Sequence, residues 1–197
     1  MSGGRCFVIR SPPMTQIPLK LKLFVPVFAL TFAIDQWTKQ WILDRFSYGE
    51  QLAIIPGFFN LTHVRNPGGA FSFLATLPEE IRQAFFLGTG LLAIVLLLIF
   101  LRRIEPRDGL AATAIGGVLG GAIGNLMDRL RYGEVVDFLD FRLIGGYVWP
   151  TFNMADCWIV VGVALLMFQM FFEPEPHDSH PDLDPALSSK VSGGAAS

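Results

Sequence analysis

Four long apolar stretches, separated by shorter polar or mixed segments, dominate the pattern of hydrophobic and polar positions along this 197-residue chain. A helix needs roughly 20 apolar residues to cross about 30 Å of hydrocarbon, and backbone polar groups in lipid must be paired within the segment. The pattern therefore predicts an α-helical integral membrane protein with four transmembrane helices. Their expected ranges are about 21–43, 84–101, 110–130 and 152–172.

Two of the connecting segments have the character of β-strands. Residues 44–83 contain the run QLAIIPGFFNLTHVRNPGGAF, in which β-branched and aromatic residues are bounded by glycines. The link after the third helix contains RYGEVVDFLDF, followed by the glycine pair Gly145–Gly146. Such composition is typical of short strands. We predict that residues 44–83 form a small strand-bearing lobe on the outer (periplasmic) membrane face.

Basic residues indicate how the chain is oriented. They precede the first helix and follow the second, at Arg5, Arg10, Lys20, Lys22, Arg102, Arg103 and Arg107. Because positive charge is enriched in cytoplasmic segments, both termini are predicted to be cytoplasmic. Residues 1–20 are expected to be flexible, with Met14 as an alternative start, and the polar residues 173–197 to form a disordered tail. Three arginines lie in the opposite loop and need another explanation: Arg129, Arg131 and Arg142.

The composition supports lipid as the main solvent and argues against several function classes. Charged residues make up 16% of the chain, against about 25% in a soluble domain, and the mean hydropathy is +0.48. The net charge of −2 argues against a nucleic-acid partner. Cys6 and Cys157 are too far apart to suggest a disulfide framework. His63, His177 and His180 form no metal-binding pattern, so no metal or other cofactor is expected.

Ionisable residues interrupt the first predicted helix. Asp35 and Lys39 are four residues apart and therefore share one face of that helix. Ionisable side chains at membrane depth are costly, which makes them candidates for function. Two explanations stay open: an ion pair that steadies the helix near the outer interface, or a direct role beside a ligand.

The third predicted helix, with the sequence GGVLGGAIGNLMDRLR, is rich in glycine. One set of glycines repeats every four residues at Gly116, Gly120 and Gly124, and a second at Gly117 and Gly121. Small residues at this spacing allow helices to approach closely in a membrane. The two sets predict two ridges for helix packing.

Polar residues follow the glycines at the end of this helix, at Asn125, Asp128 and Arg129. The two charges fit a solvated helix end. They also fit an arginine that turns back into a polar pocket and anchors a carboxylate or a peptide carbonyl. The second interpretation would explain an arginine on the side that the positive-inside rule disfavours.

Two further aspartates, Asp137 in EVVDF and Asp156 in TFNMAD, are confined to one membrane face, because one short loop joins the third and fourth helices. Two neighbouring carboxylates can share a proton, so that the ionised one activates water and the protonated one assists the carbonyl and the leaving amine. Asp156 could instead be the acidic partner of a capping box if Asn153 is the N-cap, or lie in the second turn if Pro150 begins the helix. We expect Asp156 to be the ionised member, since a helix amino terminus favours negative charge.

The ordered motifs DQWTK, RNPGGAF, GNLMDR, EVVDF and FNMAD, within about residues 20–172, resemble the bacterial lipoprotein signal peptidases (signal peptidase II). The resemblance implies a peptidase domain over residues 21–172, with four membrane helices and an outer β-cradle. It implies an intramembrane aspartic endopeptidase that cleaves diacylglyceryl-modified prolipoproteins before the lipidated cysteine. Asp137 and Asp156 correspond to the family's catalytic pair. Its supporting or substrate-binding positions correspond to Asp35, Lys39, Asn66, Gly68, Asn125, Asp128, Arg129 and Asn153.

The resemblance also implies partners and a location. The expected partners are a diacylglyceryl prolipoprotein, membrane lipid and globomycin-type inhibitors, with no nucleic acid, and we expect a monomer. The protein would be a multi-pass protein of the bacterial cytoplasmic (inner) membrane, with its active site near the outer face. Pro67 departs from the family pattern, because a small polar or hydroxylated residue is expected between Asn66 and Gly68. A proline there would stiffen the loop that covers the substrate.

Two other functions remain in competition with peptidase activity. A carboxylate-based proton or cation carrier would relay charge through Asp35, Asp137 and Asp156. It predicts acids at mid-depth in several helices, whereas these acids collect near one face. A nonenzymatic membrane scaffold would leave the asparagines and arginine around the two acids unexplained.

Overall fold

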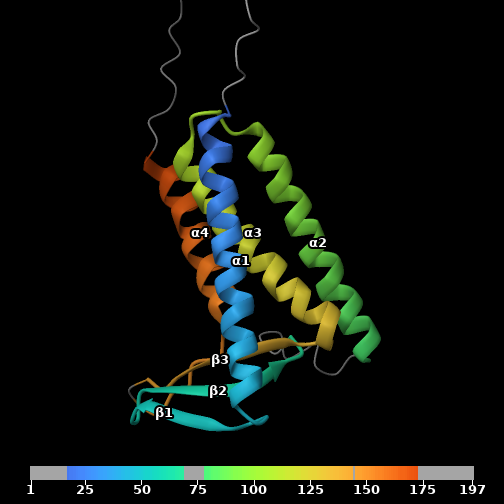
Figure 1. The fold of residues 1–197 in the computed structure, drawn as a ribbon, viewed down its shortest axis with the longest axis vertical. Coiled ribbons are helices and arrows are strands. Elements are labelled where there is room, and N and C mark those ends of the chain that lie inside the picture. The colour runs from blue at the N-terminus through green and yellow to red at the C-terminus, as the bar shows by residue number, and fades with distance from the viewer. Residues whose placement is uncertain (1–16, 69–77, 144, 173–197) are drawn as a thin grey trace, which may run out of the picture.

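The structure is a computed structural model that describes residues 17–68, 78–143 and 145–172. Its helices are α1 (Leu19–Arg45), α2 (Glu79–Arg103), α3 (Gly109–Tyr132) and α4 (Met154–Phe172). Its strands are β1 (Gln51–Ile55), β2 (Phe59–Asn66) and β3 (Val135–Phe141). The strands form a sheet at one end of the helix bundle, and α1 begins and α4 ends at the opposite end (Figure 1). The prediction of a flexible amino-terminal segment over residues 1–20 is wrong for Leu19 and Lys20, which begin α1. The predictions for residues 1–16 and 173–197, with Met14, Cys6, His177 and His180, lie outside the described residues.

All four predicted helices are present, with shifted ends. The largest shift is in α2, which begins at Glu79, so that residues 79–83 are helical and do not belong to the lobe as predicted. Pro78 occupies the N-cap position, and acidic Glu79 and Glu80 in the first turn are favourable at a helix amino terminus. Among the described residues, α2, α3 and α4 are long and apolar enough to cross a membrane.

The central element of the bundle is α3. Its most apolar window is 61% buried, whereas those of α2 and α4 are 11% buried. The glycine ridges account for this close packing. A methyl group at Gly116 would lie 3.0 Å from the carbonyl oxygen of Phe24 in α1, and one at Gly121 would collide with the carbonyl oxygen of Ala155 in α4. The two predicted ridges are confirmed, one for each neighbouring helix.

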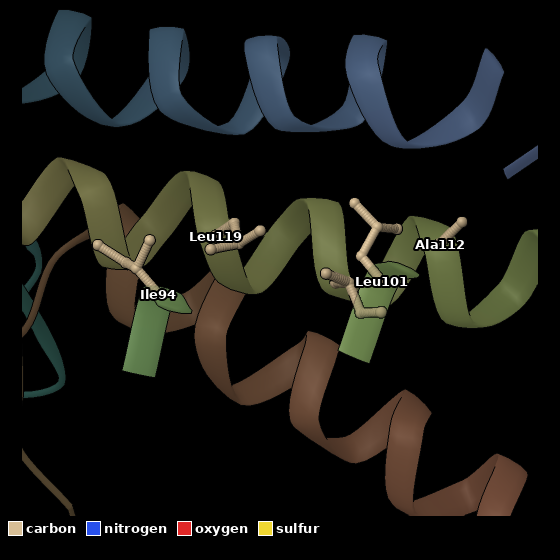
Figure 2. Packing of buried hydrophobic residues seen from close by; sticks show 5 residues of the cluster. Ile94, Leu101, Ala112 and Leu119 are labelled. Carbon is tan, nitrogen blue, oxygen red and sulfur yellow. The ribbon is translucent and has the colours of Figure 1, made fainter. Parts of the chain in front are cut away.

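The second helix, α2, packs on α3 through larger side chains. Ile94 and Leu101 of α2 lie against Ala112 and Leu119 of α3 in a buried apolar cluster (Figure 2). In the described residues α2 makes no extended contact with α1 or α4. Figure 1 shows α2 and α4 on opposite sides of α1 and α3.

The sheet is antiparallel, with strand order β1-β2-β3. Its third strand comes from the link after α3, so the lobe is larger than the predicted range of 44–83. Leu61 is opposite Leu139, and after an irregularity Val64 is opposite Asp137. The sheet thus carries Asp137 next to the bundle end where α3 finishes and α4 begins (Figure 1).

Candidate active site

The two predicted catalytic aspartates meet at Asn153. Asp137 lies in β3, and Asp156 lies in the first turn of α4. The Asn153 side-chain amide donates to Asp137 Oδ1 at 2.7 Å, and the Asn153 backbone N–H donates to Asp156 Oδ2 at 3.2 Å. One buried residue therefore ties together two carboxylates that come from different motifs and different elements.

Asp156 has the geometry of a capping box. Its backbone N–H donates to Asn153 Oδ1 at 3.1 Å, while its Oδ2 accepts from the Asn153 backbone. This confirms Asn153 as the cap, and the alternative start at Pro150 is wrong because α4 begins at Met154. The other oxygen, Oδ1, accepts from Asn125 Nδ2 at 2.9 Å. Capping uses one oxygen and leaves the second facing a different partner.

Asp137 is almost fully buried, with 1% of its surface exposed. Its Oδ2 accepts from Asn66 Nδ2 at 2.8 Å, and the Gly68 N–H donates to Asn66 Oδ1 at 2.8 Å, which orients that amide. Burial raises the pKa of Asp137 to about 7, and the nearby charge of Asp156 adds to this rise. The hydrogen bonds from the two asparagines oppose the rise in pKa, because they favour the ionised form.

A second buried cluster of polar side chains lies behind the pair, centred on Lys39. Lys39 Nζ lies 2.9 Å from Asp35 Oδ2 and 2.8 Å from Asp128 Oδ2, with all three side chains at most 3% exposed. The predicted ion pair between Asp35 and Lys39 is confirmed, and it has a third member. The interpretation of Asp128 as part of a solvated helix end is wrong.

This cluster reaches the two backbone segments that carry the candidate catalytic acids. Asp35 Oδ1 accepts from the N–H of Ala155, the residue before Asp156, at 2.9 Å. Asp128 Oδ2 accepts from the N–H of Val136, the residue before Asp137, at 3.2 Å. The ion cluster therefore holds the starts of α4 and β3 in fixed positions against α1 and α3.

Lys39 also sets the orientation of Asn125. Its Nζ donates to Asn125 Oδ1 at 2.8 Å. Because a lysine ammonium can only donate, the amide oxygen must face Lys39 and the amide nitrogen must face away from it. That nitrogen donates to Asp156 Oδ1. Lys39 therefore orients the Asn125 amide so that its nitrogen faces Asp156.

Arg129 faces a pocket of about 540 Å³ beside Asp156. Its guanidinium lies over the Phe86 ring, 4.9 Å from the centroid, and its Nη1 donates to the Asn125 carbonyl oxygen at 3.3 Å. This arrangement supports the interpretation of Arg129 as a residue that turns into a polar pocket. The other arginines of the outer segments have different partners: Arg131 donates to Gln36, and Arg142 lies 3.5 Å from Asp140.

The turn between β2 and α2 forms one wall of this pocket, through Asn66, Pro67 and Gly68. Gly68 has a φ of +112°, and a Cβ there would collide with the ring of Phe86. Both observations require glycine at this position. In contrast, Asp137 does not line the pocket and lies beneath Asn66.

Sequence reasoning missed part of the pocket wall. Phe86, Trp149 and Phe152 line it, and so does Arg65, whose guanidinium lies over the Tyr132 ring at 4.6 Å. Arg65 and Phe152 begin the motifs RNPGGAF and FNMAD but were not singled out, whereas Phe86 and Trp149 belong to no motif and had no local signal. In the described ranges, no group of three or more His, Cys, Asp and Glu side chains is placed to hold a metal ion.

Comparisons with known proteins show which family the chain belongs to. Residues 27–172 match the family model of signal peptidase (SPase) II. The lipoprotein signal peptidase of Syntrophus aciditrophicus is 45% identical over 150 residues, covering 76% of this chain and 92% of that protein. The lipoprotein signal peptidase of Serratia proteamaculans is 42% identical over 165 residues, covering 83% and 94%. A bacterial membrane enzyme solved by the in meso method has a TM-score of 0.71 at 28% identity, covering 82% of this chain and all of that one. The chain belongs to the signal peptidase II family.

Proposed function

We propose that this chain cleaves diacylglyceryl-modified prolipoproteins before the lipidated cysteine, with Asp137 and Asp156 as the catalytic pair. As a signal peptidase II, the chain is a membrane protease that processes lipoproteins. One observation carries the choice of the pair: two carboxylates share Asn153 as a donor, and one of them, Asp156, lines the adjoining pocket. Neither forms an ion pair with a lysine or arginine among the described residues.

The two acids divide the chemistry of peptide hydrolysis. Ionised Asp156 takes a proton from water as the water oxygen attacks the scissile carbonyl carbon, and protonated Asp137 donates a hydrogen bond and then its proton to the carbonyl oxygen. Asp156 then gives its proton to the amide nitrogen as the C–N bond breaks, and Asp137 recovers a proton from the diol. The raised pKa of Asp137 supports its role as the acid, because it stays largely protonated up to about pH 7.

Productive binding requires a small rearrangement at Asn66. Its amide occupies Asp137 Oδ2, the oxygen nearest the pocket wall formed by the Asn66–Gly68 turn. We expect the substrate to displace this amide so that water can lie between the two acids. Arg129 lines the same pocket, and its remaining N–H groups can bind a peptide carbonyl of the substrate.

The same proposal includes the placement in the membrane. All four helices span the inner membrane, and in α1 the charge of Lys39 is balanced by buried aspartates. The sheet and the active site face the periplasm, since Arg102, Arg103 and Arg107 lie at the opposite end of the bundle. Both termini are then cytoplasmic. The protein acts as a monomer, and globomycin-type inhibitors compete with substrate for the pocket beside Asp156.

The test is cleavage of a purified diacylated prolipoprotein in detergent. Asp137→Asn and Asp156→Asn are each expected to lower kcat by about a thousandfold or more, as in other sites whose groups act as a unit. Asp44→Asn, an exposed acid in α1, is the matched control and is expected to keep wild-type activity. Excess chelator should leave the wild-type rate unchanged.

Two outcomes would contradict the proposal. Wild-type cleavage by either variant would remove that aspartate from the pair. Proton uptake into vesicles that survives in an enzyme unable to cleave would favour a carboxylate carrier. Because Asp137 takes no part in the helix cap, its variant separates catalysis from folding even if Asp156→Asn loosens α4.

A further inference from the structure

The segment between β3 and α4 adds a short edge to the sheet beside the candidate active site (Figure 1). Phe152 exchanges both backbone hydrogen bonds with Leu139 of β3, at 2.9 and 3.2 Å, and the Trp149 N–H donates to the Phe141 carbonyl oxygen at 2.9 Å. We propose that this edge binds the substrate backbone, and that Thr151 pairs as a β-strand with the extended segment that follows the lipidated cysteine. The inference rests on the proposed function and adds a binding contact to it.

The backbone of Thr151 faces away from β3. In an antiparallel ladder, a residue that exchanges both hydrogen bonds with its partner alternates with one whose N–H and C=O point to the other side. Phe152 is of the first kind, so its neighbour Thr151 is of the second. Accordingly, neither the N–H nor the C=O of Thr151 has a hydrogen-bond partner among the described residues. Unpaired groups at a sheet edge are a template for another extended chain.

This edge faces the pocket that contains Asp156. Thr151 is partly buried, and it lines the pocket of about 540 Å³ together with its neighbours Trp149, Pro150 and Phe152. Extended peptides bind to proteins by adding a strand to an open sheet edge, where backbone hydrogen bonds supply affinity. The unpaired groups of Thr151 are therefore available to a peptide in the same pocket.

The pairing is limited to one residue of the edge. Pro150 has no backbone N–H to donate, and Phe152 turns its backbone groups toward β3. Thr151 can therefore exchange two hydrogen bonds with one substrate residue. Every residue other than proline carries the same backbone groups, so this contact holds substrates whose side chains differ.

The position of Thr151 indicates which substrate residue it meets. It lies two residues from Asn153, which donates to both candidate catalytic acids. An extended chain rises about 3.3 Å per residue, so the separation is roughly 7 Å, or two residues from the scissile bond. In the proposed orientation the sheet lies outside the membrane helices, which places the paired residue on the mature side. It is the first or second residue after the lipidated cysteine.

The edge is formed in advance of binding. The Phe152 ring stacks on Phe141, with centroids 5.7 Å apart, which holds the segment on β3. A preformed edge lowers the entropic cost of ordering the complex.

The main test uses diacylated substrate peptides in which one amide is replaced by an ester, which removes a single backbone N–H. The full-length enzyme cleaves the series in detergent, and fluorescence anisotropy measures how each peptide binds to the Asp137→Asn variant. An ester at the first or second residue after the cysteine should raise both KM and Kd by roughly fivefold to tenfold, because a hydrogen bond to the Thr151 carbonyl oxygen is lost. Esters farther along the mature segment should change both by less than about twofold.

Thr151→Pro tests the other hydrogen bond from the side of the enzyme. Proline is compatible with an edge whose N–H faces outward, so the fold should persist. We expect KM to rise about tenfold with kcat near the wild-type value, since binding of substrate and transition state is weakened equally. A structural defect would lower kcat instead. Thr151→Ala keeps the backbone N–H, and its dependence on ester position should match that of the wild type.

The outcomes separate this inference from the proposed function. Equal effects of all ester positions, or a sensitive ester only before the cleavage site, would overturn the pairing while cleavage of the all-amide peptide still supports the peptidase. Failure to cleave the all-amide peptide would contradict the proposed function, and the binding series would still test the pairing. Absence of binding by the all-amide peptide would overturn both.

Discussion

Two pairs of aspartates lie close together at the sheet end of the bundle, and they differ in the kind of partner they have. Asp35 and Asp128 share the ammonium of Lys39, at 2.9 and 2.8 Å. Asp137 and Asp156 share the amide groups of Asn153. Asp35 and Asp128 thus face a cation, whereas the side-chain donors to Asp137 are neutral amides, and burial raises the pKa of Asp137 to about 7. The first pair suits a fixed frame, and the second suits proton transfer.

The ion cluster of Asp35, Lys39 and Asp128, called the frame below, is hydrogen-bonded to the residue before each candidate catalytic acid. Asp35 accepts from the residue before Asp156, and Asp128 accepts from the residue before Asp137. The frame therefore positions the backbone beside Asp137 and Asp156. The side chains of these two acids accept hydrogen bonds from asparagine amides instead. This division predicts that variants of the frame act on folding, while variants of the site act on rate and pH dependence.

The largest effect on stability is expected from Lys39→Met. It leaves two buried carboxylates without their cation, which typically costs about 3–5 kcal/mol. Unfolding in mixed micelles, followed by circular dichroism, measures the change. Asp137→Asn is the comparison variant, and at pH 8 it should lower the unfolding free energy much less than Lys39→Met does. It removes a charge that burial disfavours, which offsets the hydrogen bond lost when an amide nitrogen faces one of the two asparagine donors. If both variants lose similar stability, the distinction between frame and site is wrong.

A smaller loss is expected from Gly124→Ala. A Cβ at Gly124 would collide with the carboxylate of Asp35, and overpacking of this kind costs about 1–3 kcal/mol. Gly88→Ala is the matched control, because nothing lies within 4 Å of a Cβ there. In the middle of α2 it should stabilise the protein by roughly 0.5–1 kcal/mol. Equal effects at the two glycines would show that Asp35 has room to move.

The smallest effect is a shift in pH dependence in Asn66→Ala. Cleavage by the wild type should fall as the pH rises through about 7, since Asp137 then loses the proton that it must donate. The Asn66 amide stabilises the ionised form, so removing it should raise the pKa and move this alkaline limb upward by roughly one pH unit. The profile of kcat/KM against pH measures the shift.

Asn60→Ala is the control for that profile. Asn60 is also on β2, but it donates to Asp140, so the limb should stay in place. A downward shift in Asn66→Ala, or the same shift in both variants, would contradict the assignment of Asp137 as the proton donor.

Features that depend on local sequence were predictable. Apolar runs located the four helices, and glycine spacing located the two packing ridges of α3. The capping box of Asn153 and Asp156 follows from a spacing of three residues. In the sequence, capping and catalysis looked like rival roles for Asp156. In the structure the cap uses Oδ2 and leaves Oδ1 facing Asn125, so capping is compatible with the proposed catalytic role.

Features that depend on residues far apart in the chain were not predictable. The pairing of Lys39 with Asp128 joins α1 to α3, and the pairing of β2 with β3 joins the two strand-like segments. The meeting of Phe86 and Arg129 in the pocket wall has no local signal either. Such contacts depend on how the helices cross, and a single sequence carries no record of that geometry. The motif resemblance named most of the polar residues without saying which ones touch.

The proposed double role of Asp156, in the helix cap and in catalysis, has a consequence for inhibitor resistance. A bacterium escapes an active-site inhibitor through substitutions that weaken the drug and spare the enzyme. At this pocket few such substitutions are open: Asp156 also caps α4, the Asn66 side chain also accepts from the Gly68 N–H, and Gly68 has no space for a side chain. A compound whose affinity comes from these three positions should select for resistance slowly, and mainly through changes in expression or uptake.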